Sequence, residues 1–194
     1  VSKKNVPLSV LEKTSTPRPP CEITLLQAIP RGKILESIIQ KATELGVARM
    51  VPLLADRIVS HLDKESAEEK LEKWRQVSME AIKQCGQPWL PRIETPMTPK
   101  DFLSRAENFD LALIGSLQAD SRHPAEIFSK IRQEQKTLRR VCVWVGPEGD
   151  FSPDEMTAIQ AAGAFPITLG DLVLRCETAA IYCLSILNYE LGKK

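Results

Sequence analysis

The chain alternates between segments with the spacing of strands and segments with the spacing of helices. The run Val141–Val145 (VCVWV) is apolar without interruption, which is typical of a central parallel strand that is covered on both faces. Strands that alternate with helices predict an α/β fold with a mostly parallel sheet flanked by helices. Further strands are predicted at Cys21–Ile29, Val47–Leu54, Asp110–Gly115 and Phe165–Leu169.

Helical spacing of apolar residues separates these strands. Ser152 is predicted to cap one helix, because Pro153 follows it and Glu155 stands three residues after it. The last helix is apolar nearly all round, so it is either a covered core helix or a core helix that also meets a partner subunit. The predicted helices are Lys33–Leu45, Ser66–Cys85, Pro124–Gln135, Ser152–Ala162 and Thr178–Leu191, and Pro88–Pro99 is predicted to be extended or irregular.

Composition excludes several classes of protein. The 194 residues are enough for one domain, and 43% apolar content supports a packed core. The formal net charge of +1 argues against a polybasic nucleic-acid coat. No apolar run approaches the roughly 20 residues of a membrane span, and no signal peptide opens the sequence. Five scattered cysteines without a C-x-x-C pair favour a reducing cytoplasm over a disulfide framework or a zinc site, and His61 and His123 are predicted to be solvated.

The sequence opens on Val1, and Val1–Glu12 has the short alternation of one or two strands without a preceding partner. We interpret this segment as the end of a β-rich domain that has been truncated; the alternative is a processed N-terminus. Thr14–Pro20 (TSTPRPP) is predicted to be a linker, because it is rich in proline and lacks apolar periodicity.

Two loops at the carboxyl ends of predicted strands carry the chemistry, because ligands bind there in open α/β sheets. Gly146–Ser152 (GPEGDFS) has two glycines that allow close backbone approach, yet it is neither a P-loop nor a dinucleotide motif, and it also fits a plain strand-to-helix turn. In Leu169–Ala179 (LGDLVLRCETA), Arg175 and Glu177 arrive together at a helix start. They form either a functional pair or a salt bridge beside a capping Thr178.

Taken together, these motifs resemble those of the small-subunit ribosomal RNA uridine-N3 methyltransferases, in the SPOUT superfamily of trefoil-knotted, S-adenosylmethionine-dependent enzymes. Lys41–Arg57 and Met79–Ile93 reinforce the resemblance, which extends from Glu22 to the C-terminus. It implies a homodimer whose C-terminal segment forms a deep knot. It also implies that residues 1–20 are a remnant of a PUA-like β-barrel plus linker, and that 21–194 form the methyltransferase domain.

The resemblance further implies which residues hold the methyl donor, S-adenosylmethionine. Its adenine is held largely by backbone groups of three loops, which suits glycines and small or aliphatic side chains. The match is weakest for the first of these loops, which contains Leu113, Ile114 and Gly115. The implied cofactor-binding residues are Leu113, Ile114, Gly115, Val145, Gly146, Pro147, Glu148, Gly149, Leu169, Gly170, Val173, Leu174 and Arg175.

Uridine N3 carries a proton, so a site must accept that proton or stabilise the charge that spreads onto the flanking carbonyl oxygens. Arg175 is the candidate for the second role and Glu177 for the first. No metal is implied. The candidate contacts to ribosomal RNA are Arg31, Lys33 and Arg57, each of which also fits a solvated charge.

Three positions depart from the family pattern. Asp150 replaces a second glycine, Cys176 replaces a threonine, and Gln87 replaces an arginine, which removes an expected phosphate contact. The implied function is methylation of a uridine N3 in 16S-type ribosomal RNA. The alternatives are a SPOUT methyltransferase that acts on another RNA site and a catalytically silent RNA-binding scaffold.

Overall fold

The computed structural model describes residues 9–57, 64–118 and 120–192, with the side chains of 64–67 outside the description. These residues form one six-stranded sheet in the order β3-β2-β1-β5-β4-β6, in which every pairing is parallel. The predicted α/β class with a parallel sheet is therefore confirmed. The strands are β1 (Glu22–Ala28), β2 (Arg49–Leu53), β3 (Arg92–Ile93), β4 (Leu111–Gly115), β5 (Arg140–Val145) and β6 (Ala164–Ile167).

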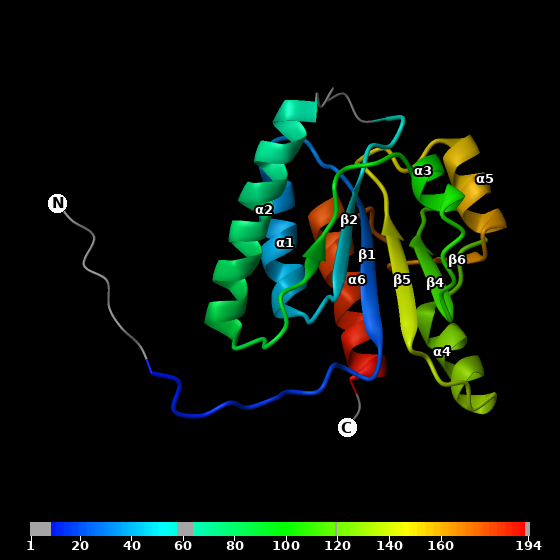
Figure 1. Ribbon diagram of the computed structural model, residues 1–194. Helices are drawn as coiled ribbons and strands as arrows, with labels where there is room; N and C mark the ends of the chain where they lie inside the picture. The colour runs from blue at the N-terminus through cyan, green and yellow to red at the C-terminus, as the bar shows by residue number, and fades with distance from the viewer. Residues whose placement is uncertain (1–8, 58–63, 119, 193–194) are drawn as a thin grey trace.

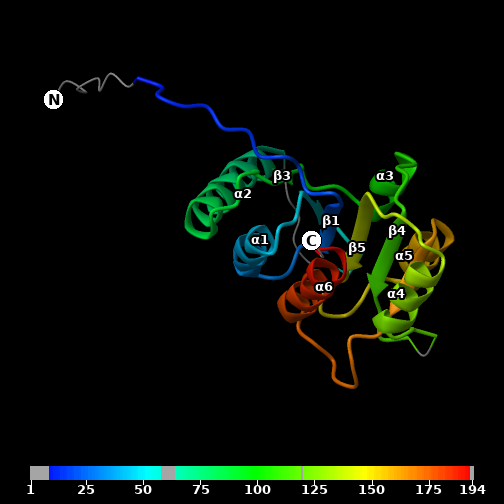
Figure 2. The ribbon, with the colours of Figure 1, turned by 90° about the horizontal axis from the view of Figure 1, so that it is seen from below.

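Helices cover both faces of this sheet (Figures 1 and 2). On one face lie α1 (Ile34–Glu44), α4 (Pro124–Gln133) and α6 (Cys176–Leu191), with α2 (Lys64–Cys85) packed beside α1. On the other face lie the shorter α3 (Pro99–Ser104) and α5 (Pro153–Ala161). Within the described residues, no helix combines the length and apolarity that crossing a bilayer would need.

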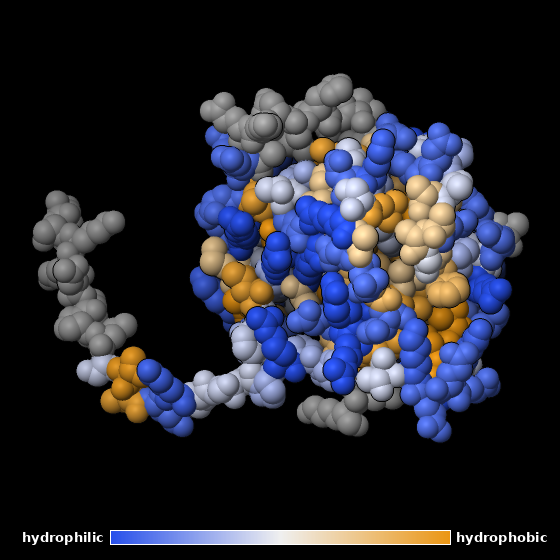
Figure 3. Space-filling view, turned by 45° about the vertical axis from the view of Figure 1, so that its right-hand side comes forward, coloured by the Kyte–Doolittle hydropathy of each residue, from blue (hydrophilic) through white to orange (hydrophobic). Residues whose placement is uncertain are grey.

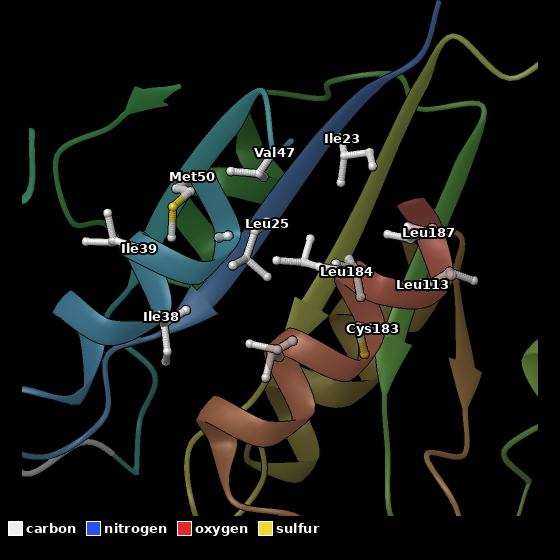
Figure 4. Packing of buried hydrophobic residues seen from close by; sticks show 14 of the residues in the cluster. Ile23, Leu25, Ile38, Ile39, Val47, Met50, Leu113, Cys183, Leu184 and Leu187 are labelled. Carbon is white, nitrogen blue, oxygen red and sulfur yellow. The ribbon is translucent and has the colours of Figure 1, made fainter. Parts of the chain in front are cut away.

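The alternation of side chains along the strands divides the core in two. Val143 of β5 lies in the cluster beneath α1 and α6, whereas its neighbour Trp144 lies in the cluster beneath α3 and α5. Figure 4 shows Leu25 of β1 and Leu184 of α6 among the residues of the first cluster. Both faces of β5 are thus buried, as its continuous apolar run predicts.

The helices and strands predicted from Cys21 onward are present, and their ends agree within two residues. The segment Pro88–Pro99 is extended or irregular as predicted, apart from Pro99, and contains the short strand β3; Pro99 begins α3, which was not predicted. A capping box begins α3. The Thr98 side chain accepts from the backbone N–H of Asp101, and the Asp101 carboxylate accepts from the backbone N–H of Thr98.

The described part of the N-terminal segment, residues 9–20, contains no helix or strand. The predicted strand character of Val1–Glu12 is therefore wrong for residues 9–12, and residues 1–8 lie outside the described part. Figure 3 shows this segment as an arm that leaves the body of the molecule. The linker is nonetheless anchored, because the Trp89 indole donates to the Pro17 carbonyl at 3.2 Å and the Arg18 guanidinium lies 4.2 Å from the Trp89 ring centroid.

A charged cluster near the amino ends of β2 and β5 ties the chain together around Arg49. The Arg49 guanidinium donates two hydrogen bonds to Glu107, at 2.6 and 2.8 Å, and its Nε lies 2.6 Å from Glu94. Arg105 donates to the other oxygen of Glu94 at 2.7 Å, and Arg140 lies 3.2 Å from Glu107. The Glu94 side chain is only 5% exposed, so it depends on these cations for compensation.

The cluster also shifts the titration of its two carboxyl groups. Burial acts to raise the pKa of Glu94, but the hydrogen bond from Arg105 and the charge of Arg49 outweigh it, so that this pKa is lowered. The pKa of Glu107 is lowered chiefly by its hydrogen bonds from Arg49. A carboxyl group whose pKa falls on folding stabilises the protein above its ordinary pKa, and this stability is lost as the pH falls through the lowered value.

We predict that Arg49→Met lowers the free energy of unfolding by about 3 kcal/mol at pH 7, because it leaves the Glu94 and Glu107 carboxylates without their shared cation. The difference between the two proteins should shrink below the ordinary glutamate pKa of 4.5, where the wild-type cluster itself loses its charges. Urea denaturation at pH 7 and at acidic pH measures both quantities.

Arg75→Met on α2 is the control, since Arg75 makes only an exposed ion pair with Glu72 at 3.9 Å. Its effect should stay within about 0.5 kcal/mol. Equal losses in the two variants, or a loss in Arg49→Met that persists undiminished at acidic pH, would contradict the stabilising role of the cluster.

Candidate functional site

The loops that follow β4, β5 and β6 meet at the carboxyl edge of the sheet and enclose one cavity. Parallel pairing of β4 with both β5 and β6 brings the three strand ends side by side. The cavity is open to solvent, and its volume is about 60 Å³. It is lined by Gly115, Ser116, Leu117, Val145, Gly146, Pro147, Glu148, Asp150, Leu169, Gly170, Leu172, Val173, Leu174, Cys176 and Ala179.

The loops after β4 and β6 are in direct contact. The backbone N–H of Ser116 donates to the carbonyl of Ile167 at 3.0 Å. A side-chain carbon added at Gly115 would lie 3.4 Å from Leu169, at the limit of ordinary contact. A larger residue at the end of β4 would therefore press on the loop that follows β6.

The GPEGD loop after β5 closes on itself through a tight turn. The backbone N–H of Asp150 donates to the Pro147 carbonyl at 2.9 Å. Asp150 has φ +64°, a left-handed conformation that glycine adopts readily and aspartate tolerates, and its carboxylate accepts from the backbone N–H of Phe151 at 2.8 Å. This geometry explains how an aspartate is accommodated at a position whose backbone conformation favours glycine. A side chain at Gly146 would approach the Asp150 carboxylate to 3.1 Å, so the start of the loop has little room for one.

The loop after β6 presents apolar side chains beside the cavity. Gly170 has φ +111°, and its backbone N–H donates to the Thr168 hydroxyl at 3.2 Å. The loop then exposes Leu172 and Val173, which are 76% and 74% accessible. Exposed aliphatic side chains next to a cavity are typical of a surface that a ligand or a partner covers.

The helix α6 begins at Cys176, two residues before the predicted start. Arg175 occupies the N-cap position, so Thr178 lies inside the first turn and the prediction that it caps the helix is wrong. The alternative of an Arg175–Glu177 salt bridge is also wrong, since no ion pair joins these two described residues. The Cys176 thiol is buried, and burial together with the nearby Glu177 raises its pKa to about 12, so it remains a packed, protonated group.

Arg175 and Glu177 do not line the cavity themselves but flank its lining residue Cys176 in sequence. The Arg175 side chain is exposed and makes no hydrogen bond or ion pair with the other described residues. Glu177 is half-buried and accepts a hydrogen bond from the Cys176 thiol. A free guanidinium and a carboxylate beside a cavity are suited to anion stabilisation and to proton transfer, respectively.

Nine of the residues predicted to bind cofactor line this cavity. Leu113 and Ile114 instead point into the two core clusters, and Gly149 and Arg175 lie next to lining residues. The cavity also has lining residues that the prediction did not include. They lie within or beside the predicted motifs, which indicated the loops but not every wall of the cavity: Ser116, Leu117, Asp150, Leu172, Cys176 and Ala179.

The predicted RNA contacts follow other strands of the same edge. Arg31 and Lys33 are exposed on the loop between β1 and α1. Arg57, after β2, donates a hydrogen bond from its guanidinium to the Gly149 carbonyl of the GPEGD loop. Gln87 follows α2 and does not line the cavity. Its side chain faces Gly46.

Of the two histidines predicted to be solvated, the structure describes only His123. His123 is exposed and caps α4, because its Nδ1 accepts from the backbone N–H of Ala125 at 3.2 Å. His61 lies outside the described residues. Among residues 9–57, 64–118 and 120–192, no three His, Cys, Asp or Glu side chains come together in a group suited to a metal ion.

The chain is similar to known RNA methyltransferases. Residues 17–188 match the family model of the RNA methyltransferase domain. The ribosomal RNA small subunit methyltransferase E of Bacillus subtilis is 31% identical over 191 residues, which are 98% of this chain and 75% of that protein. The enzyme of the same name from Mesomycoplasma hyopneumoniae is 32% identical over 86% of this chain and 69% of its own length.

Solved structures agree with these relatives. A methyltransferase of Legionella pneumophila, in complex with S-adenosylmethionine, is 35% identical with a TM-score of 0.78, over 88% of this chain and 66% of that one. The ribosomal RNA small subunit methyltransferase E of Neisseria gonorrhoeae, also bound to S-adenosylmethionine, is 27% identical with a TM-score of 0.78, over 90% and 69%. This chain thus spans 66–75% of the length of these four proteins. It belongs to the family of RNA methyltransferase domains, together with the ribosomal RNA small subunit methyltransferases E.

Proposed function

We propose that this chain binds S-adenosylmethionine in the cavity between the loops after β4, β5 and β6, and that it methylates N3 of a uridine in 16S-type ribosomal RNA of the small subunit. The observation that carries the proposal is the convergence of GPEGD and LGDLVLR, which are 18 or more residues apart in sequence, on one cavity. The S-adenosylmethionine held by the two solved relatives supports the choice of donor.

The lining of the cavity fits such a donor. Glycines at 115, 146 and 170 leave backbone N–H and C=O groups accessible to an adenine, while Leu117, Leu172 and Val173 offer apolar cover. Glu148 supplies the one carboxylate of this loop that is exposed, near the place where a cationic donor would be held.

When bound, S-adenosylmethionine supplies a methyl group on a sulfonium, which is transferred by in-line displacement. The residues of the chain then position the acceptor. We assign to Arg175 the stabilisation of negative charge on the carbonyl oxygens that flank N3, and to Glu177 the acceptance of the N3 proton. Both assignments rest on the exposed guanidinium and the neighbouring carboxylate beside the cavity.

The exposed Arg31 and Lys33 lie on the loop after β1, at the same edge of the sheet as the cavity. We propose that they contact RNA phosphates, because phosphate contacts supply most of the affinity for RNA and do not require a buried site. Arg57, the third predicted RNA contact, also donates a hydrogen bond to the Gly149 carbonyl of the GPEGD loop.

We also propose that the chain is a homodimer with a C-terminal knot. The exposed side of α6 carries Tyr182 and Tyr189, and with α4 it forms a mostly apolar hollow of about 360 Å³ that a second copy would cover. The path of the chain supports the knot: after β6, at one edge of the sheet, residues 168–175 return past the ends of β4 and β5 so that α6 packs against β1 and β5.

We predict that Arg175→Ala loses at least about a hundredfold in turnover, because it removes the group that stabilises charge on the acceptor. The affinity for S-adenosylhomocysteine should change little, since the cavity lining is intact. Calorimetric titration and a methyl-transfer assay on hypomethylated small subunits measure the two quantities. Arg75→Ala, an exposed change on α2, is the matched control.

A wild-type protein that gives no heat with S-adenosylhomocysteine would identify a silent scaffold and end the proposal of an enzyme. A loss of donor affinity in Arg175→Ala as large as the loss of turnover would instead show that Arg175 belongs to the donor site rather than to the acceptor site.

We predict a second outcome for the product. Small subunits methylated by this protein should yield 3-methyluridine on nucleoside analysis by mass spectrometry, because the proposed proton acceptor acts on a ring nitrogen. Methyl groups found on a ribose oxygen, on another base, or in transfer RNA would contradict the substrate assignment while leaving donor binding intact.

A further inference from the structure

The turn formed by Asp56 and Arg57 is remote in sequence from the cavity loops, yet it makes a hydrogen bond to one of them, the GPEGD loop. Asp56 and Arg57 follow β2, the strand that is separated from β5 by β1. Both residues are exposed, yet each makes side-chain or backbone contacts with residues that follow β5. The turn therefore reaches over the end of β1 to the GPEGD loop and the start of α5.

Three hydrogen bonds join the turn to the segment after β5, and a fourth, within the cap of α5, holds the Glu155 carboxylate that takes part in one of them. The Arg57 guanidinium donates to the carbonyl of Gly149, and the Arg57 side chain also packs against Gly149, with its Cδ 3.6 Å from the point where a side-chain carbon would stand. The Ser152 hydroxyl donates to the Asp56 carboxylate at 2.8 Å. The Glu155 carboxylate accepts from the backbone N–H of Asp56 at 2.9 Å and from that of Ser152 at 2.8 Å.

The position of this junction matters because Gly149 lies between Glu148 and Asp150, which both line the cavity. In the described part of the chain, no other residue outside the loop donates a hydrogen bond to the Gly149 carbonyl. A bond from a charged guanidinium is stronger than one between neutral groups, and it fixes the direction of the carbonyl. A loop that is already in its binding shape loses less freedom when a ligand binds.

We propose that Arg57, with Asp56, is a positioning residue for the methyl donor: it holds the GPEGD loop in the shape that binds S-adenosylmethionine. The proposal rests on the proposed function. It differs from the prediction that Arg57 contacts RNA, because an RNA contact alters the affinity for RNA, whereas a positioning residue alters the affinity for the donor when no RNA is present.

Titration with S-adenosylhomocysteine in the absence of RNA separates the two roles. Arg57→Ala should raise the Kd on the order of tenfold, the scale of one charge-assisted hydrogen bond, and leave the melting temperature nearly unchanged because the side chain is exposed. Arg57→Lys should recover part of the affinity, since an ammonium also donates to a carbonyl. Arg75→Ala removes the same charge from α2 and should match the wild type.

Kinetics provide the second readout. In Arg57→Ala the KM for S-adenosylmethionine should rise while kcat changes little, because the group that acts on the acceptor is untouched. A wild-type Kd in Arg57→Ala, with only the RNA affinity reduced, would overturn the positioning role and restore the RNA contact. A wild-type protein that binds no S-adenosylhomocysteine would instead remove the proposed function, and the inference with it.

Discussion

The parallel pairing of β4 with β5 on one side and β6 on the other is the constraint on which the site depends. Because all three strands run in the same direction, their carboxyl ends stop at one edge, and the loops that leave them have to share that space. The contact between Gly115 and Leu169 and the bond from Ser116 to Ile167 show how closely two of these loops lie. A cavity lined by residues drawn from segments 115–117, 145–150 and 169–179 is the consequence.

Local patterns in the sequence predicted most of this arrangement. The apolar run of β5 indicated a central strand, and the capping box of Ser152 and Glu155 placed the start of α5. Both patterns depend on neighbours in the chain, which a sequence displays directly. The cavity loops followed from the rule that ligands bind at the carboxyl ends of strands, combined with a family resemblance that marked GPEGD and LGDLVLR.

Local sequence patterns could not predict features that depend on contacts between residues far apart in the chain. The residues near Arg57 in sequence do not predict its hydrogen bond to Gly149. The linker sequence likewise does not predict that the Trp89 indole donates to the Pro17 carbonyl. The start of α6 was placed too late because Thr178 has the chemistry of a cap, while the backbone turns into the helix at Arg175. Only α3 was missed despite a local pattern, since Thr98 and Asp101 form a recognisable capping box.

The central claim is that one pocket at this edge receives the donor. Amide chemical shifts of the isotope-labelled protein, followed by NMR during titration with S-adenosylhomocysteine, test it most directly. The claim predicts that the largest shifts map to residues 115–117, 145–150 and 169–176, with smaller ones at Asp56 and Arg57. Shifts centred instead on the hollow between α3 and α5, around Thr98, Leu103 and Ala158, would contradict it.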